Sequence, residues 1–210
     1  MINWPALSDK QIESAAEQFR NEALDSLGLD RSTLPVPVER IAEFHLGYEL
    51  DFTDQDADII GGIDFQAGII LINPAIEDHE GRYNFTIAHE IGHHCLHREL
   101  YIKHQDALGI LCRSKARPIE EVQADRFAEA LLMPPKPIQA ATKRSKWRYA
   151  TTTKSRNALA ADIIKTLELN GISVSAMAVR LDHLRIAPRQ LTKTQIFTRR
   201  VLGFTRFITP

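Results

Sequence analysis

Five consecutive residues, His89-Glu90-Ile91-Gly92-His93, constrain this chain more than any other feature of its sequence. On a helix, residues four apart share one face, so the imidazoles of His89 and His93 can reach one metal ion with the Glu90 carboxylate beside them. Imidazole nitrogens suit Zn²⁺, and a carboxylate can position and deprotonate its water. The alternative is a pair of surface histidines on an ordinary helix. The strand-like segments that precede the motif favour a buried helix with a zinc site.

A catalytic zinc site uses three protein ligands and leaves one position open, so a third ligand is expected elsewhere in the chain. The best candidate lies in a second predicted helix, where Glu121 and Asp125 stand one turn apart on the same face. Glu121 can bind the metal while Asp125 accepts the ring N–H of a ligand histidine and fixes its orientation. Glu120 stays open as an alternative ligand. Both glutamates could instead merely complement the helix N-terminus.

Two segments of the chain resemble the core of the ImmA/IrrE family of metallo-endopeptidases. They are Arg82 to His93, followed by Leu96-His97, and Glu121 to Pro134. Three flanking segments are also similar to the family: Gly61-Gly62, Ile70 to Pro74 and Val174 to Leu184. The resemblance covers the chain from about residue 35 to residue 186. The family usually has a carboxylate where this chain has Gln123, and that departure favours Glu121 as the metal ligand.

The resemblance implies that His89, His93 and Glu121 bind Zn²⁺ and that Glu90 is the catalytic base. Members of the family cleave helix-turn-helix transcriptional repressors and so switch on stress, phage-related or mobile-element genes. We therefore expect a zinc endopeptidase whose substrate is such a repressor. Two alternatives stay open: a DNA-binding regulator with a structural zinc site, and a toxin-like protease of a two-gene pair.

The location expected from the sequence is the cytoplasm. Met1 to Leu7 lack the basic end and apolar run of a signal peptide. No apolar stretch is long enough for a membrane helix, so no membrane partner is expected. The two cysteines cannot form a disulfide framework, which also favours a reducing compartment.

Charge is divided unevenly along the chain. Residues 1–110 carry 7 basic and 20 acidic side chains, whereas residues 111–210 carry 19 and 7. One basic stretch interleaves cations with an aromatic ring: Lys143, Arg144, Lys146, Trp147 and Arg148. Cations follow phosphates and aromatic rings stack on unpaired bases, which indicates single-stranded DNA or another nucleic acid as a partner. Docking of the repressor and pairing of the basic half with the acidic half are the alternatives.

Cys112 is a candidate inhibitory fourth ligand of the zinc ion. It lies between the two predicted metal-binding helices and has three basic neighbours, which favour the thiolate form. The alternative is an ordinary loop cysteine. We interpret His97 as a helix-end residue, because Glu121 completes the ligand set, and Cys95 as a small buried side chain. Candidates for stabilising the oxyanion are Tyr83, Tyr101, His104 and Tyr149.

The periodicity of apolar residues predicts an α+β fold, with a small antiparallel sheet flanked by helices. Helices are expected over 8–27, 38–46, 86–97, 119–133, 157–169 and 176–184, and strands over 48–52, 59–65 and 68–73. We expect residues 98–118 to be irregular and residues 136–156 to form a linker or exposed loop. Residues 1–137 are predicted to form the zinc peptidase domain, and residues 138–210 a basic, helix-turn-helix-like region with a tail.

Overall fold

The computed structural model describes residues 5–52, 60–103 and 118–186, and the backbone of residues 111–112. The chain divides into two compact units, Met1–Leu132 and Met133–Pro210. Each unit is considered by itself. Among the described residues, none of the helices is long and apolar enough to cross a membrane.

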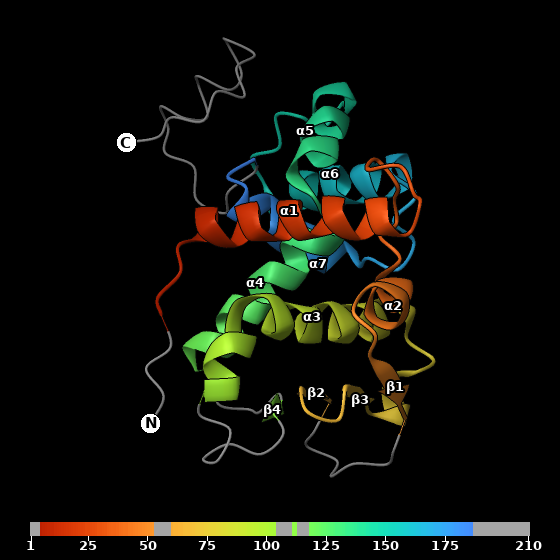
Figure 1. Ribbon diagram of the computed structural model, residues 1–210. Helices are drawn as coiled ribbons and strands as arrows, with labels where there is room; N and C mark the ends of the chain where they lie inside the picture. Colours follow the sequence, from red (N-terminus) through yellow and green to blue (C-terminus); the bar gives the residue numbers. More distant parts are fainter. Residues whose placement is uncertain (1–4, 53–59, 104–110, 113–117, 187–210) are drawn as a thin grey trace. The chain divides into compact units, whose positions relative to one another are not determined.

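Unit 1 contains a small sheet with its helices stacked on one side of it (Figure 1). In chain order its elements are α1 Asp9–Ser26, α2 Val38–Arg40, the π-helix η1 Ile41–His45, β1 Glu49–Asp51, β2 Gly61–Asp64, β3 Ile69–Ile72, the 3₁₀ helix η2 Pro74–Ile76, α3 Glu80–Lys103, β4 Leu111–Cys112 and α4 Ile119–Leu132.

Helix α1 begins as its sequence predicts. Ser8 and Gln11 form a reciprocal capping box, which satisfies two backbone N–H groups at the start of the helix. One apolar face of α1 is buried, and the helix packs on α4, where the rings of Phe19 and Phe127 lie 6.0 Å apart. The chain then leaves the helix at Gly28, whose φ of 67° suits glycine.

The four strands form one sheet in the order β1-β3-β2-β4. Strands β2 and β3 form an antiparallel hairpin, which the turn-forming residues Gln66-Ala67-Gly68 between them favour, and β4 pairs antiparallel with β2. Strand β1 runs parallel to β3, so the sheet is mixed rather than wholly antiparallel. The turn signal between β2 and β3 specifies only the pairing of those two strands, and no local signal specifies the partner of β1. The α+β class is confirmed.

Helix α3 is longer than predicted and lies between the sheet and α1 in Figure 1. It continues through Lys103, so residues 98–103 are helical and the prediction of an irregular stretch is wrong there. Residues 111–112 form strand β4, another departure from that prediction. The error arises because the apolar residues of this segment, Leu100, Tyr101 and Ile102, are consecutive and do not show the helical spacing by which a sequence reveals a helix.

Unit 2 consists of three described helices, α5 Pro135–Arg144, α6 Thr153–Thr166 and α7 Val174–His183. The prediction of a linker over 136–156 is wrong for much of that range, because α5 occupies residues 136–144 and α6 begins at residue 153. The prolines of α5 stand in the first turn, where a missing N–H costs nothing. Helices α6 and α7 pack together, and the buried Arg156 and Arg180 donate hydrogen bonds to the carbonyls of Ala178 and Met133.

Candidate metal centre

Three side chains that can bind a metal converge in unit 1. The Nε2 atoms of His89 and His93, one turn apart on α3, lie 3.0 Å from each other. Glu121, in the first turn of α4, reaches both: its Oε2 is 3.3 Å from His89 Nε2 and its Oε1 is 3.2 Å from His93 Nε2. All three residues are buried, and their ligand atoms lie within 4.8 Å of one another. Two imidazoles and one carboxylate so arranged suit a divalent metal ion.

The close crossing of α3 and α4 places Glu121 opposite the two histidines. At the crossing, a Cβ built on Gly92 would lie 3.1 Å from the carbonyl oxygen of Ala124 and 3.2 Å from the Cβ of Phe127. Glycine therefore lets the two backbones approach more closely than other residues would.

Glu90 is 1% exposed and lies on the side of α3 that faces strand β2. A Cβ built on Gly61 would overlap the methyl group of Thr86 and lie 3.2 Å from Glu90 Oε1. Strand β2 thus passes directly beside the carboxylate, and a glycine there leaves room for it. Glu90 therefore follows the candidate metal ligand His89 in the sequence, and its side chain lies against the sheet.

Asp125 takes the position that its spacing from Glu121 suggests. Its Oδ1 lies 3.0 Å from His89 Nδ1, so it accepts the Nδ1–H. When a metal ion replaces the second ring proton, the lone pair of His89 is on Nε2, where it can bind the ion. The side chain of Asp125 is one-fifth exposed, whereas that of His89 is fully buried. Asp125 therefore orients one of the two imidazoles from the outer side of the site.

In the metal-free cluster, hydrogen bonds favour a positive charge on His89 and a negative charge on Glu121. Burial lowers the pKa of His89, but hydrogen bonds to Asp125 and Glu121 outweigh it and raise the pKa to about 9. Burial raises the pKa of Glu121, but hydrogen bonds from His89 and His93 outweigh it and lower the pKa to about 2. Burial lowers the pKa of His93. At neutral pH a protonated His89 therefore faces an ionised Glu121.

A comparison with protein families matches residues 38–182 to the IrrE N-terminal-like domain of the Peptidase M78 family. The chain belongs to this family. The matched range contains the whole His–His–Glu cluster, Glu90 and Asp125, and family membership together with that cluster supports a metallopeptidase. A comparison with curated proteins gives no match.

In this M78 domain the interpretation of His97 as a helix-end residue is wrong. Helix α3 continues six residues beyond it, and His97 is fully buried. Its Nδ1 lies 3.0 Å from His93 Nδ1, and its Nε2 lies 3.0 Å from Gln123 Oε1. Sequence reasoning missed both supporting residues, although His97 is four residues after His93 and Gln123 two after Glu121. Burial lowers the pKa of His97 to about 4, which favours a neutral ring.

Of the four candidates for stabilising an oxyanion, two lie in unit 1, one lies in unit 2 and one lies outside the described residues. Tyr83 stacks on Phe52, and burial raises the pKa of its hydroxyl to about 12. Tyr101 packs edge-on against Phe65, with ring centroids 4.8 Å apart. Tyr149 belongs to unit 2, and His104 lies outside the described residues. The assignment of this role therefore stays a prediction.

Cys112 belongs to strand β4, where its backbone pairs with Gly62 of β2. Its side chain lies outside the described part of the structure, so the prediction that it binds the metal remains open. The neighbouring Gly61 is the residue that stands against Glu90. Cys95, the other cysteine, lies on α3, and burial raises the pKa of its thiol.

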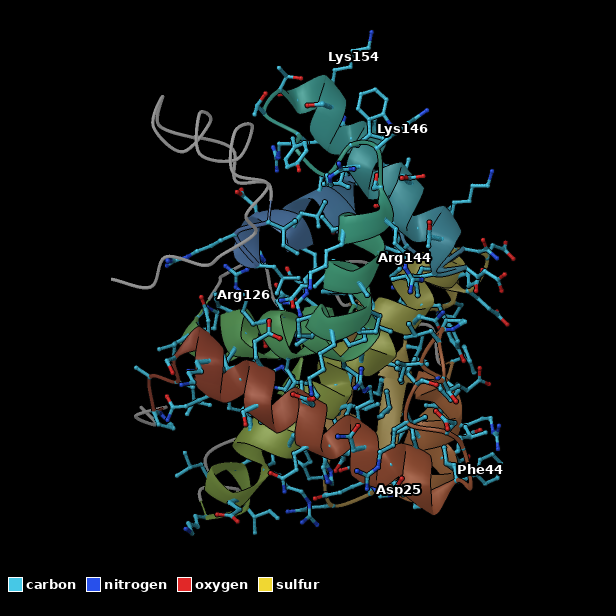
Figure 2. All side chains as sticks on the ribbon, turned by 90° about the horizontal axis from the view of Figure 1, so that it is seen from above. Asp25, Phe44, Arg126, Arg144, Lys146 and Lys154 are labelled. Atoms are coloured by element: carbon cyan, nitrogen blue, oxygen red, sulfur yellow. The ribbon has the colours of Figure 1, made fainter. Side chains whose placement is uncertain are left out.

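The basic stretch lies at the junction of α5 and α6 in unit 2. Lys143, Arg144, Lys146 and Arg148 are exposed, and the Trp147 side chain is 37% exposed. The cations also cover neighbouring rings: Lys146 Nζ lies 5.6 Å from the Trp147 ring and Arg148 Cζ lies 4.7 Å from the Tyr149 ring. Figure 2 shows Lys146 and Lys154 pointing away from the ribbon at this end of the two helices.

Proposed function

We propose that this chain is a zinc-dependent endopeptidase of the cytoplasm that cleaves a helix-turn-helix transcriptional repressor. The observation that carries the peptidase proposal is the buried convergence of His89, His93 and Glu121 around one point, next to the buried carboxylate of Glu90. The described residues supply three ligands, the number found in catalytic zinc sites, whereas structural sites use four. This count favours an enzyme over a regulator with a structural zinc site.

Zinc is the metal that the donor set fits best, because imidazole and carboxylate ligands in a three-ligand set are typical of hydrolytic zinc. A bound zinc ion would supply Lewis-acid chemistry, lowering the pKa of water and polarising the peptide carbonyl. His89 and His93 present their Nε2 atoms to the site, and Glu121 presents both carboxylate oxygens. These three residues would hold the ion.

Glu90 would move the proton. As general base it takes a proton from the attacking water, and as general acid it returns that proton to the amine that leaves the cleaved peptide bond. Burial beside β2 keeps bulk water away from the carboxylate. A peptide substrate would then bind with its scissile carbonyl between Glu90 and the His–His–Glu cluster.

The test is zinc content together with cleavage of a helix-turn-helix repressor, taken from a neighbouring gene where one encodes such a protein. We expect Glu90→Gln to keep zinc and to lose cleavage by about 10²- to 10⁴-fold, since it removes the proton-transfer group. Glu99→Gln is the matched control, because Glu99 is exposed on the same helix. Cleavage that survives Glu90→Gln contradicts the mechanism. A repressor that stays intact while other cell proteins are cut would favour the toxin-like alternative.

Cys112 is proposed as a regulator of the same site. A thiolate there would occupy the open coordination position and hold the enzyme off. Cys112→Ser is expected to raise basal cleavage of the repressor. Unchanged basal cleavage in that variant removes the proposal.

Nucleic-acid binding is a second candidate function, favoured by the charge of unit 2. Its described residues, 133–186, include ten Lys and Arg but three Asp and Glu. Lys143, Arg144 and Lys146 are exposed within four consecutive positions, and phosphates of single-stranded DNA can bind there. Such binding would regulate proteolysis or bring the enzyme to a DNA-bound repressor.

We expect the affinity for single-stranded DNA to fall steeply with salt. The variant Lys143→Gln with Lys146→Gln removes two charges, so its log–log salt slope becomes shallower by about 1.4 if both contact phosphates. The charge-matched control is Lys136→Gln with Lys165→Gln, on exposed positions of α5 and α6. Absence of wild-type binding at low salt, or equal losses in the two variants, contradicts a site on this stretch.

A further inference from the structure

A chain of buried polar groups runs from His93 to the segment that precedes α1. His93 Nδ1 lies 3.0 Å from His97 Nδ1, and His97 Nε2 lies 3.0 Å from Gln123 Oε1. The amide nitrogen of Gln123 then lies 2.7 Å from the carbonyl oxygen of Pro5. His93, His97 and Gln123 are each at most 3% exposed. A polar chain this deeply buried has a definite hydrogen-bond order, because its groups have little access to water.

The carbonyl at the far end sets the direction of every bond. A carbonyl oxygen only accepts, so Gln123 must turn its NH₂ group toward Pro5 and its amide oxygen toward His97. That oxygen accepts from His97, so His97 carries its hydrogen on Nε2. A neutral ring with hydrogen on Nε2 has a lone pair on Nδ1, which accepts the Nδ1–H of His93. In the metal-bound site this order leaves the lone pair of His93 on Nε2, the atom that lies 3.2 Å from Glu121 Oε1, so that Nε2 can bind the ion.

We propose that His97 and Gln123 are positioning residues that fix the metal-binding tautomer and ring orientation of His93. The inference rests on the metal site of the proposed function and does not require peptide cleavage. Asp125 accepts a hydrogen bond from the ring of His89 and so fixes its orientation. His97 does the same for His93, but as a neutral group backed by Gln123 rather than as a carboxylate. A carboxylate at position 123 would accept from His97 but could not donate to Pro5. The glutamine at position 123 therefore links the site by a hydrogen bond to the carbonyl of Pro5. Pro5 lies outside the range that the family model matches.

The direct test is the tautomer of each ring, read by ¹⁵N–¹H long-range correlation NMR of the zinc-loaded wild-type protein. We expect hydrogen on Nε2 of His97 and on Nδ1 of His93. Hydrogen on Nδ1 of His97 would overturn the proposed order, because His93 would then have no acceptor there.

Zinc affinity, measured by competition with a chromophoric chelator, gives a second test. Gln123→Met keeps the approximate size of the side chain and removes both hydrogen bonds, so we expect a 10- to 100-fold weaker affinity. Gln123→Glu restores the acceptor for His97 and should bind within about threefold of wild type. Gln139→Met, the same change on α5, is the control and should leave the affinity unchanged.

The outcomes separate this inference from the proposed function. Wild-type zinc binding with an unchanged affinity in Gln123→Met overturns the positioning role alone. Absence of zinc binding by the wild type overturns both. If Gln123→Met fails to fold, the tautomers of the wild type decide the question, since they need no variant.

Discussion

At the scale of single residues, the metal-free site holds a proton that a metal ion must displace. With its pKa raised to about 9, mainly by Asp125 and Glu121 acting against burial, His89 is protonated at pH 7. We therefore expect the apparent affinity for zinc to rise about tenfold per pH unit up to about pH 9 and then to level off. Calorimetry in buffers of different ionisation enthalpy should show one proton released per zinc at pH 7. A count of zero contradicts the charge state assigned to His89.

The same proton affects the stability of the metal-free fold, and the sign follows from the direction of the shift. The folded pKa of His89 lies above its ordinary value of 6.5. Its contribution to the free energy of unfolding is therefore fully present below pH 6.5 and is lost as the pH rises through about 9. Metal-free protein should accordingly lose stability over this range, whereas zinc-loaded protein should lose none through His89.

At the scale of the elements, the crossing of α3 and α4 decides whether the ligands meet. Gly92→Ala places a methyl group 3.1 Å from the Ala124 carbonyl, so α4 must move away by a few tenths of an ångström. We expect a stability loss of about 1–3 kcal/mol, typical of overpacking, together with weaker zinc binding because Glu121 moves with α4. Chemical denaturation and chelator competition measure the two effects. Wild-type values in both would show that the crossing does not position the site.

The elements also show where the sequence suffices and where it does not. The helix that begins after Ser8, the helix that carries His89 and His93, and strands β2 and β3 are each specified by residues within a few positions, and all form where the sequence predicts them. The parallel pairing of β1 and the contact of His97 with Gln123 join segments far apart in the chain. No local pattern specifies such contacts. The prolines in the first turn of α5 are compatible with a helix, but prolines at such positions are equally typical of a loop, so the sequence does not decide between the two.

At the scale of the whole molecule, the metal site belongs to one unit. The ligands come from α3 and α4 of unit 1, whereas α6 and α7 belong to unit 2. Zinc at about a thousandfold excess over its Kd should add about 4 kcal/mol to the stability of the fold that binds it. Hydrogen exchange with and without chelator should locate the added protection in α3 and α4. An equal gain in α6 and α7 would contradict a site built by unit 1 alone.

The central claim is that His89, His93 and Glu121 form a zinc site, and zinc stoichiometry in a matched pair of variants tests it most directly. Native mass spectrometry should find one zinc per chain in the wild type and in Glu120→Gln. In Glu121→Gln it should find little or none, because that change removes the carboxylate that contacts both histidines. Zinc lost in Glu120→Gln and kept in Glu121→Gln, or a wild type that binds no zinc, would contradict the account.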